Sequence, residues 1–166
     1  IECKKFIIKK GWQPENKVSV LLNGFDEEIH RKIPNAKKDI DVLFIGNILP
    51  RRRIWLDKIG KYCNLVECKA YNNEMVNLFN RAKIVINIHA ENYLDTETRV
   101  FEALGCGSFL ISEKLSEDNP FISGKHYVED PNSDEMIEKI FFYLNNDSER
   151  EKIALEGHNE ALEKHT

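Results

Sequence analysis

Short runs of apolar, often β-branched residues constrain the fold of this chain more than any other feature. They span residues 18–22, 41–46, 64–68, 83–89 and 108–112, with a weaker run at 125–128. Runs of this length with few polar interruptions are typical of strands that are buried on both faces of a parallel sheet. We therefore predict a parallel sheet built from these segments.

Apolar residues recur at helical spacing between the runs. The predicted helices cover residues 54–62, 73–82, 98–104 and 133–144, and a last helix opens near residue 148. Asn73 and Thr98 are predicted N-caps, and Ser148 with Glu151 forms a capping-box pattern. Because strands and helices alternate, the predicted fold class is α/β, a doubly wound, Rossmann-like parallel sheet.

Ligands of doubly wound sheets bind at the carboxyl ends of the strands. We therefore expect ligand-binding residues in the loops after Gly46, Cys68, His89 and Ser112. The chain has 166 residues, which is one domain's worth of sequence. Many enzymes that bind a ligand between two domains need about twice this length.

Composition excludes several classes of protein. With 42% hydrophobic residues, 8 glycines and 5 prolines, the chain is neither disordered nor of low complexity. No apolar run approaches the ~20 residues of a transmembrane helix. The formal net charge of −4 argues against a general nucleic-acid binder.

The cysteines and the start of the chain suggest where the protein works. Cys3, Cys63, Cys68 and Cys106 form no CxxC pair and have no zinc-type spacing, so we expect reduced thiols in a cytoplasmic protein and no metal site.

The first residue is not methionine, and the opening apolar run contains charges, unlike a signal peptide. We expect a segment cut from a longer protein, with residues 1–17 as a linker remnant and residues 18–166 as the folded domain.

The first candidate site is the segment GNILPRRR, which follows a predicted strand. Gly46 and Asn47 form the turn, and Arg51, Arg52 and Arg53 lead into a helix. Glycine lets the backbone approach a ligand closely, a helix N-terminus attracts anions, and arginine matches phosphate oxygens. The segment predicts a phosphate or diphosphate site; the alternative is a solvated basic turn. It is not a Walker A motif, so a P-loop ATPase is unsupported.

The second candidate is the segment ETRVFEALGCG. Arg99 and Glu102 are three residues apart on one helix face and can touch. In the functional interpretation, Arg99 neutralises a phosphate and Glu102 accepts hydrogen bonds from the vicinal hydroxyls of a ribose. The alternative is an ordinary surface ion pair. Gly105 and Gly107 would let the helix end pack closely against the next strand.

The third candidate is the stretch from Asn87 to Glu97. His89 ends a buried strand at the binding edge, where a structural hydrogen-bonding role is the alternative to a functional one. Glu91, Asp95 and Glu97 are acidic loop neighbours, and most loop carboxylates are simply solvated.

Several of these segments together resemble a known family. The segments are NGFDEEIHRKI, DVLFIGN followed by RRR, NEMVNLFNRAKIVINIH, TRVFEALGCGSFLIS and a final ER–IA–GH–HT pattern. They resemble the carboxyl-terminal domain of GT-B glycosyltransferases, most closely the spore-maturation-type branch with its R-x-F-E-A-x-x-C/A-G signature. The likeness runs from about Val18 to Thr166, and Arg99 to Gly107 is its most specific part. The Asn23-Gly24 pair resembles the link between the two domains.

The resemblance implies a site for a nucleotide-sugar donor. Glu102 corresponds to a ribose ligand, Arg99 and the group Arg51 to Arg53 to diphosphate ligands, and Tyr71 to the position where the nucleobase packs. Glu97 and Thr98 lie near the donor sugar or its phosphate, with Glu97 and Arg99 as the catalytic candidates. The remaining donor-binding candidates are Gly46, Asn47 and His89.

One departure from the family pattern concerns stereochemistry. Many retaining members carry two glutamates separated by seven residues, and the position matching the first of them is Leu94. Asp95 or Glu97 could substitute for it. Retention and inversion at the anomeric carbon therefore both stay open.

The resemblance also implies the reaction and its partners. The expected reaction is metal-independent glycosyl transfer without a cofactor, and the expected source is bacterial. The acceptor would bind to a missing amino-terminal domain. The full-length protein would associate with membranes peripherally. A metal-dependent alternative would need a DxD pair of aspartates at the binding edge. Asp39 and Asp41 have this spacing, but they stand at the start of a strand, away from that edge. The alternatives are a GT-B-like sugar-nucleotide epimerase and a non-catalytic, flavodoxin-like interaction domain.

Overall fold

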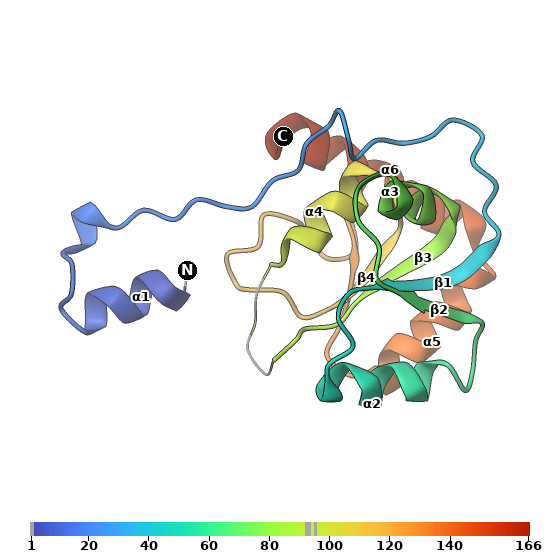
Figure 1. Cartoon of the computed structure of the whole chain (residues 1–166), viewed down its shortest axis with the longest axis horizontal. Helices are drawn as coiled ribbons and strands as arrows, with labels where there is room; N and C mark the ends of the chain where they lie inside the picture. The colour runs from blue at the N-terminus through green and yellow to red at the C-terminus, as the bar shows by residue number, and fades with distance from the viewer. Residues whose placement is uncertain (1, 92–93, 95) are drawn as a thin grey trace.

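The computed structural model describes residues 2–91, 94 and 96–166, and it contains one five-stranded sheet with the strand order β2-β1-β3-β4-β5. Every neighbouring pair of strands is parallel. The elements, shown in Figure 1, are α1 (Glu2–Lys9), a 3-10 turn (Glu15–Lys17), β1 (Ile40–Ile45), α2 (Pro50–Ile59), β2 (Leu65–Cys68), α3 (Asn72–Arg81), β3 (Ala82–Asn87), α4 (Thr98–Gly105), β4 (Leu110–Glu113), β5 (Val128–Asp130), α5 (Ser133–Leu144) and α6 (Asp147–Lys164). The predicted α/β, Rossmann-like fold is confirmed.

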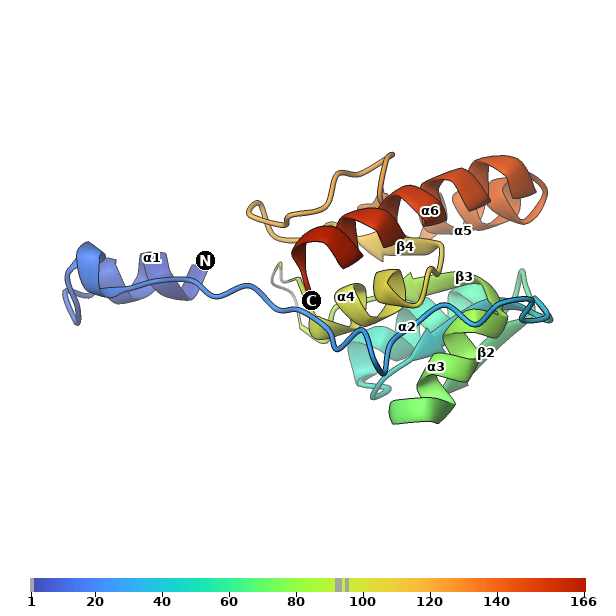
Figure 2. The ribbon, with the colours of Figure 1, turned by 90° about the horizontal axis from the view of Figure 1, so that it is seen from above.

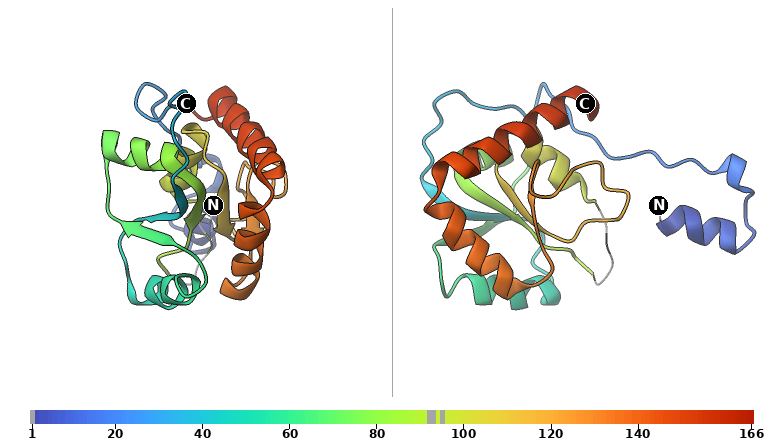
Figure 3. Two further views of the ribbon diagram at one scale, coloured as in Figure 1. Left: turned by 90° about the vertical axis from the view of Figure 1, so that its right-hand side faces the viewer. Right: turned by 180° about the vertical axis from the view of Figure 1, so that it is seen from behind.

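Helices cover both faces of the sheet, as the end-on view in Figure 3 (left) shows. On one face α3 and α4 bury a core that includes Leu43, Phe79 and Phe101. On the other face α2 and α5 bury a second core around Phe44, Leu56 and the β3 isoleucines. The last helix, α6, contacts both α4 and α5 and so joins the helices that cover the two faces of the sheet (Figure 2). A sheet buried on both faces explains why its strands are apolar without interruption.

Four predicted strands correspond closely to β1, β2, β3 and β4, and the fifth, β5, begins at Val128, where the predicted run 125–128 ends. The predicted strand at residues 18–22 is wrong. These residues are extended but unpaired, and Leu21 is 95% exposed. In Figure 1 the chain before residue 25 extends away from the sheet and carries α1 at its far end. A strand needs a hydrogen-bonding neighbour, and this segment has none among the described residues.

Helix α2 begins at Pro50, four residues before the predicted 54, and the predicted starts of α3, α4 and α6 are displaced by one or two residues. Tyr71 is the N-cap of α3 instead of Asn73, and Glu97 is the N-cap of α4 instead of Thr98. Asn146 precedes α6, so Ser148 lies inside the helix and makes no cap. The extended backbone of Tyr71 and Glu97 marks the half-in position that defines a cap. Each helix therefore begins slightly earlier than the sequence pattern indicates.

The cysteines of the described chain form no disulfide; Cys63 and Cys68 are half-buried and Cys106 is buried. Burial raises the pKa of the Cys106 thiol to about 12, so this thiol is unreactive. The side chain of Cys3 lies outside the described residues. Within the described ranges, no helix has the length and apolar character needed to cross a membrane. The described His, Cys, Asp and Glu side chains form no group of three that could hold a metal ion.

Candidate functional site

A network of ion pairs lies at the carboxyl edge of the sheet. Glu113, the last residue of β4, is 5% exposed. Its carboxylate accepts hydrogen bonds from both terminal guanidinium nitrogens of Arg51, at 2.8 and 2.5 Å, and from the backbone N–H of His89, at 2.6 Å. Arg51 also donates to the carbonyl of His89 at 2.9 Å. This network connects the start of α2 to the ends of β3 and β4.

Arg52 ties the loop after β1 to the same edge. Its Nε donates to the carbonyl of Ile88 at 2.8 Å, and its Nη1 donates to the carbonyl of Asn47 at 3.1 Å. Its Nη2 lies 3.2 Å from Oε1 of Glu97, the N-cap of α4. The guanidinium also lies 5.5 Å from the ring centre of Phe44. Arg52 therefore fixes Glu97 and the Gly46-Asn47 turn relative to each other.

His89 lies inside this network and is 3% exposed. Its Nε2 lies 2.8 Å from the carbonyl of Lys114, which makes Nε2 a donor. Its Nδ1 has no hydrogen-bond partner among the described residues, and Oε1 of Glu97 stands 3.8 Å away. Burial lowers the pKa of His89, but the interactions with Glu97, Lys114 and Glu113 outweigh burial, so the net shift is upward. The neighbouring carboxylates therefore stabilise the protonated form of His89 relative to the neutral form.

Replacing His89 with glutamine is expected to change how stability depends on pH. The raised pKa means that protonated His89 stabilises the fold below the unfolded-state pKa of about 6.5, and that this contribution is lost as pH rises through the folded-state pKa. Glutamine keeps a donor for the Lys114 carbonyl but carries no charge. Unfolding by urea across about pH 5.5 to 8.5 should show a smaller loss of stability with rising pH in His89→Gln.

The pKa of His126 is shifted in the opposite direction to that of His89, so His126 serves as a comparison. Burial lowers its pKa despite the nearby Glu160, so its contribution is lost as pH falls. The variant His126→Gln should therefore reduce the loss of stability on the acid side. A His89→Gln variant with the same pH profile as the unaltered protein would contradict the raised pKa of His89.

The other predicted site residues fall into separate places. Arg53 turns away from the network and pairs with Asp57 at 3.0 Å and with Glu67 at 2.9 Å. Tyr71 is 65% exposed, and Thr98 is exposed as the first residue of α4. The group Arg51 to Arg53 thus does not act as one basic cluster.

Arg99 and Glu102 pair with each other on α4 at 2.9 Å, as their spacing predicted. Arg99 lies over the ring of Phe79 and contacts Sδ of Met75, so its stem packs on α3. Glu102 also faces the imidazole of His30, with Nε2 3.7 Å from Oε1. Both members of the Arg99–Glu102 pair are about one-fifth exposed, which leaves them accessible to a ligand.

Sequence reasoning missed two residues of this region, Glu113 and His30. Glu113 follows the predicted strand 108–112 directly, and a charged residue at the carboxyl end of a buried strand is a signal that could have found it. His30 had no comparable signal, because its contact with Glu102 joins residues far apart in the sequence. Asp95, an acidic candidate of the same loop, lies outside the described residues.

A cavity of about 310 Å³ opens at this edge. Its lining residues are Arg51, His89, Glu91, Leu94, Glu113, Lys114 and Pro131. Through this cavity a ligand can reach the ion pair between the half-buried Arg51 and the buried Glu113. The arrangement offers arginine donors and fixed carboxylate acceptors, which suits a polar, anionic ligand with hydroxyl groups.

Several solved structures share this fold at low sequence identity. HepE from Anabaena, solved in complex with UDP-glucose, has 13% identity and a TM-score of 0.79 over 98% of this chain and 57% of that chain. The carboxyl-terminal domain of a glycosyl transferase group 1 family protein, LpcC from Francisella tularensis, has 14% identity and a TM-score of 0.67 over 85% of this chain and 98% of that one. A TarM variant from S. aureus, solved with UDP, has 16% identity and a TM-score of 0.73 over 100% of this chain and 40% of that one.

These likenesses show that the chain shares its Rossmann-like fold with solved glycosyltransferase structures. Residues 25–166 match the glycosyl transferase-like family, and the chain belongs to that family. Comparison with curated proteins gave no significant match. The chain spans 57% of the length of HepE. The narrower assignment to the spore-maturation-type branch and the domain boundary at residue 18 stay predictions.

Proposed function

We propose that this chain is the donor-binding domain of a glycosyltransferase that uses a nucleoside-diphosphate sugar. The observation that carries the proposal is the Arg99–Glu102 pair, which is partly exposed on α4 in a domain of the glycosyl transferase-like family. Two structures of similar fold were solved with UDP or UDP-glucose, which supports a nucleotide sugar as the donor.

In this proposal Glu102 binds the ribose. A carboxylate has acceptor oxygens and no donor, so it suits two adjacent hydroxyl groups. The nearby His30 and Arg99 hold the Glu102 carboxylate from two sides, which limits its rotation. Tyr71, exposed at the start of α3, offers a ring on which the base packs.

Arg99, with Arg51 and Arg52, would stabilise the diphosphate leaving group. A guanidinium carries a delocalised positive charge and a planar set of N–H donors that matches phosphate oxygens. The ion pairs of Arg51 and Arg52 hold these arginines in position before the reaction, and fixed charges stabilise a developing anion without reorganisation. This chemistry needs no metal. Glu97, held by Arg52 beside His89, would face the donor sugar.

The acceptor would bind to a second domain. This chain covers only 57% of HepE, which supports a separate acceptor-binding region in the full protein. The full protein would work in the cytoplasm and associate with membranes at most peripherally. The isolated domain should bind the donor weakly and transfer no sugar, because the facing wall of the cleft is supplied by the second domain.

Replacing Glu102 or Arg99 with alanine is expected to weaken nucleotide binding about tenfold each, since each change removes a charged hydrogen-bond partner of the ligand. Isothermal titration calorimetry with UDP and with GDP measures this effect. Glu138→Ala, an exposed change on α5, is the matched control and should leave affinity unaltered. Unchanged nucleotide affinity in both Glu102→Ala and Arg99→Ala would reject this site.

A further inference from the structure

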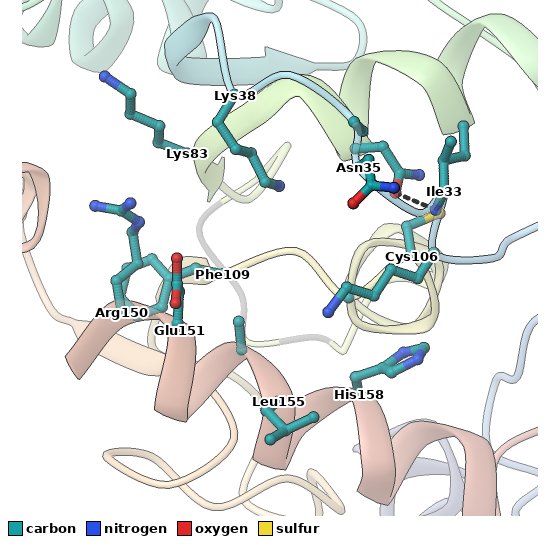
Figure 4. A pocket seen from close by; sticks show the side chains of 15 residues that line it. Ile33, Asn35, Lys38, Lys83, Cys106, Phe109, Arg150, Glu151, Leu155 and His158 are labelled. Atoms are coloured by element: carbon teal, nitrogen blue, oxygen red, sulfur yellow. Dashed lines mark hydrogen bonds between the residues drawn. The ribbon is translucent and has the colours of Figure 1, made fainter. Parts of the chain in front are cut away.

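A second, larger cavity lies at the opposite edge of the sheet. Its volume is about 430 Å³. Lys38 precedes β1, Lys83 is the second residue of β3, and Phe109 precedes β4, so the cavity stands at the amino ends of these strands. Figure 4 shows Lys38 and Lys83 on one side and the α6 residues Arg150 and His158 on the other. The proposed donor site is at the carboxyl ends of the same strands.

The cavity is strongly cationic. Four basic side chains line it, together with one carboxylate, that of Glu151; the basic residues are Lys32, Lys38, Lys83 and Arg150. Lys83 is paired with Asp41 at 2.6 Å, and the buried Arg150 is paired with Asp147 at 2.8 Å. Lys38 makes no ion pair with any described residue: its ammonium donates to the carbonyl of Ala82 at 2.8 Å.

Lys38 therefore carries a charge that its surroundings oppose. Burial lowers the pKa of Lys38, and the nearby Arg150 and Lys32 lower it further. The acidic groups Glu151 and Cys106 act in the other direction but do not offset these effects, and the pKa falls to about 8. A bound anion would supply the missing counter-charge.

Gly107 helps to form the cationic wall. Its φ is +70°, a left-handed conformation that favours glycine. A Cβ added at Gly107 would lie 3.3 Å from Cδ of Lys32, so the absence of a side chain leaves room for the Lys32 stem across the end of α4. Gly107 belongs to the TRVFEALGCG segment but has no role in the proposed donor site.

We propose that this cavity binds a phosphomonoester, with its dianionic phosphate near Lys38, Lys32 and Arg150. The volume falls in the range of small-molecule sites and exceeds the space that one phosphate fills. Ile33, Phe109 and Leu155 supply apolar wall for the organic part, and Asn35 and His158 supply polar groups. The site is separate from the donor site and does not depend on it.

The test is a titration of the ¹⁵N-labelled chain with phenyl phosphate, followed by two-dimensional NMR. We expect saturable shifts at the amides of Gly107, Leu155 and His158. Lys38→Met should weaken binding about tenfold by removing one charged contact. Lys17→Met, at the exposed end of the 3-10 turn before the domain, is the matched control and should bind like the unaltered chain. Lys32→Ala is the second variant if Lys38→Met does not give a folded spectrum.

Two further ligands separate this site from the donor site. Inorganic phosphate should bind the same amides more weakly, since it lacks the organic part. UDP should shift the amides of Gly46 and Asn47 and leave those of the cavity unaltered. The proposal is overturned by an absence of saturable shifts at the cavity up to about 10 mM phenyl phosphate, or by unaltered affinity in both lysine variants. Either result leaves the calorimetric test of Glu102 and Arg99 unaffected.

Discussion

Replacing Gly157 with alanine should lower the free energy of unfolding by about 3 kcal/mol. Gly157 is buried in α6, and an added Cβ would lie well inside van der Waals distance of the His126 carbonyl oxygen and 3.0 Å from Cδ2 of Leu104. Alanine favours an isolated helix over glycine by up to about 1 kcal/mol. The clash is with backbone, which cannot rotate away as a side chain can, so destabilisation outweighs the helical preference.

Urea unfolding followed by circular dichroism measures the effect of Gly157→Ala. Glu156→Ala, at the exposed neighbouring position of the same helix, is the control and should change stability by no more than about 0.5 kcal/mol. A Gly157→Ala protein as stable as the unaltered chain would show that α6 does not pack directly on the loop at His126. That loop precedes β5, so the prediction also tests how the sheet edge is closed.

The strands could be predicted from the sequence because burial on both faces leaves a local signal. Residues 83–89 are apolar with few interruptions, and they cover all but the first residue of β3, the central strand. Residues 18–22 carry the same signal but form no strand, since the pattern records apolar character and not the presence of a neighbouring strand. The sequence pattern therefore lacks the tertiary contacts that decide whether an apolar run forms a strand.

In the candidate site, too, local contacts could be predicted from the sequence and long-range contacts could not. The Arg99–Glu102 contact is local, three residues apart on one helix, and the sequence predicted it correctly. The partner of Arg51 is Glu113, 62 residues away, and no local pattern connects the two. Arg51, Arg52 and Arg53 look equivalent in the sequence, yet the first turn of α2 directs Arg53 toward Glu67 and the other two toward β3 and β4. Helical rotation of about 100° per residue separates their directions.

Removing the carboxylate of Glu113 should therefore disturb more than one element. In Glu113→Ala, Arg51 and the backbone N–H of His89 lose their acceptor at the buried end of β4. Breaking a buried ion pair costs about 3–5 kcal/mol, and the Arg51 side chain is 25% exposed, so we expect a loss of about 2–3 kcal/mol in the free energy of unfolding. Urea unfolding measures this loss.

A double-mutant cycle with Arg51→Ala distinguishes the pair from its surroundings. The two single changes should be strongly non-additive, because the second removes a partner that the first has already left unpaired. Glu117→Ala, whose side chain is 76% exposed, is the control and should have little effect. Additive losses would show that Glu113 acts mainly through His89. If the donor proposal is correct, Glu113→Ala should also weaken UDP binding although Glu113 need not touch the nucleotide, because Arg51 would no longer be held toward the ligand.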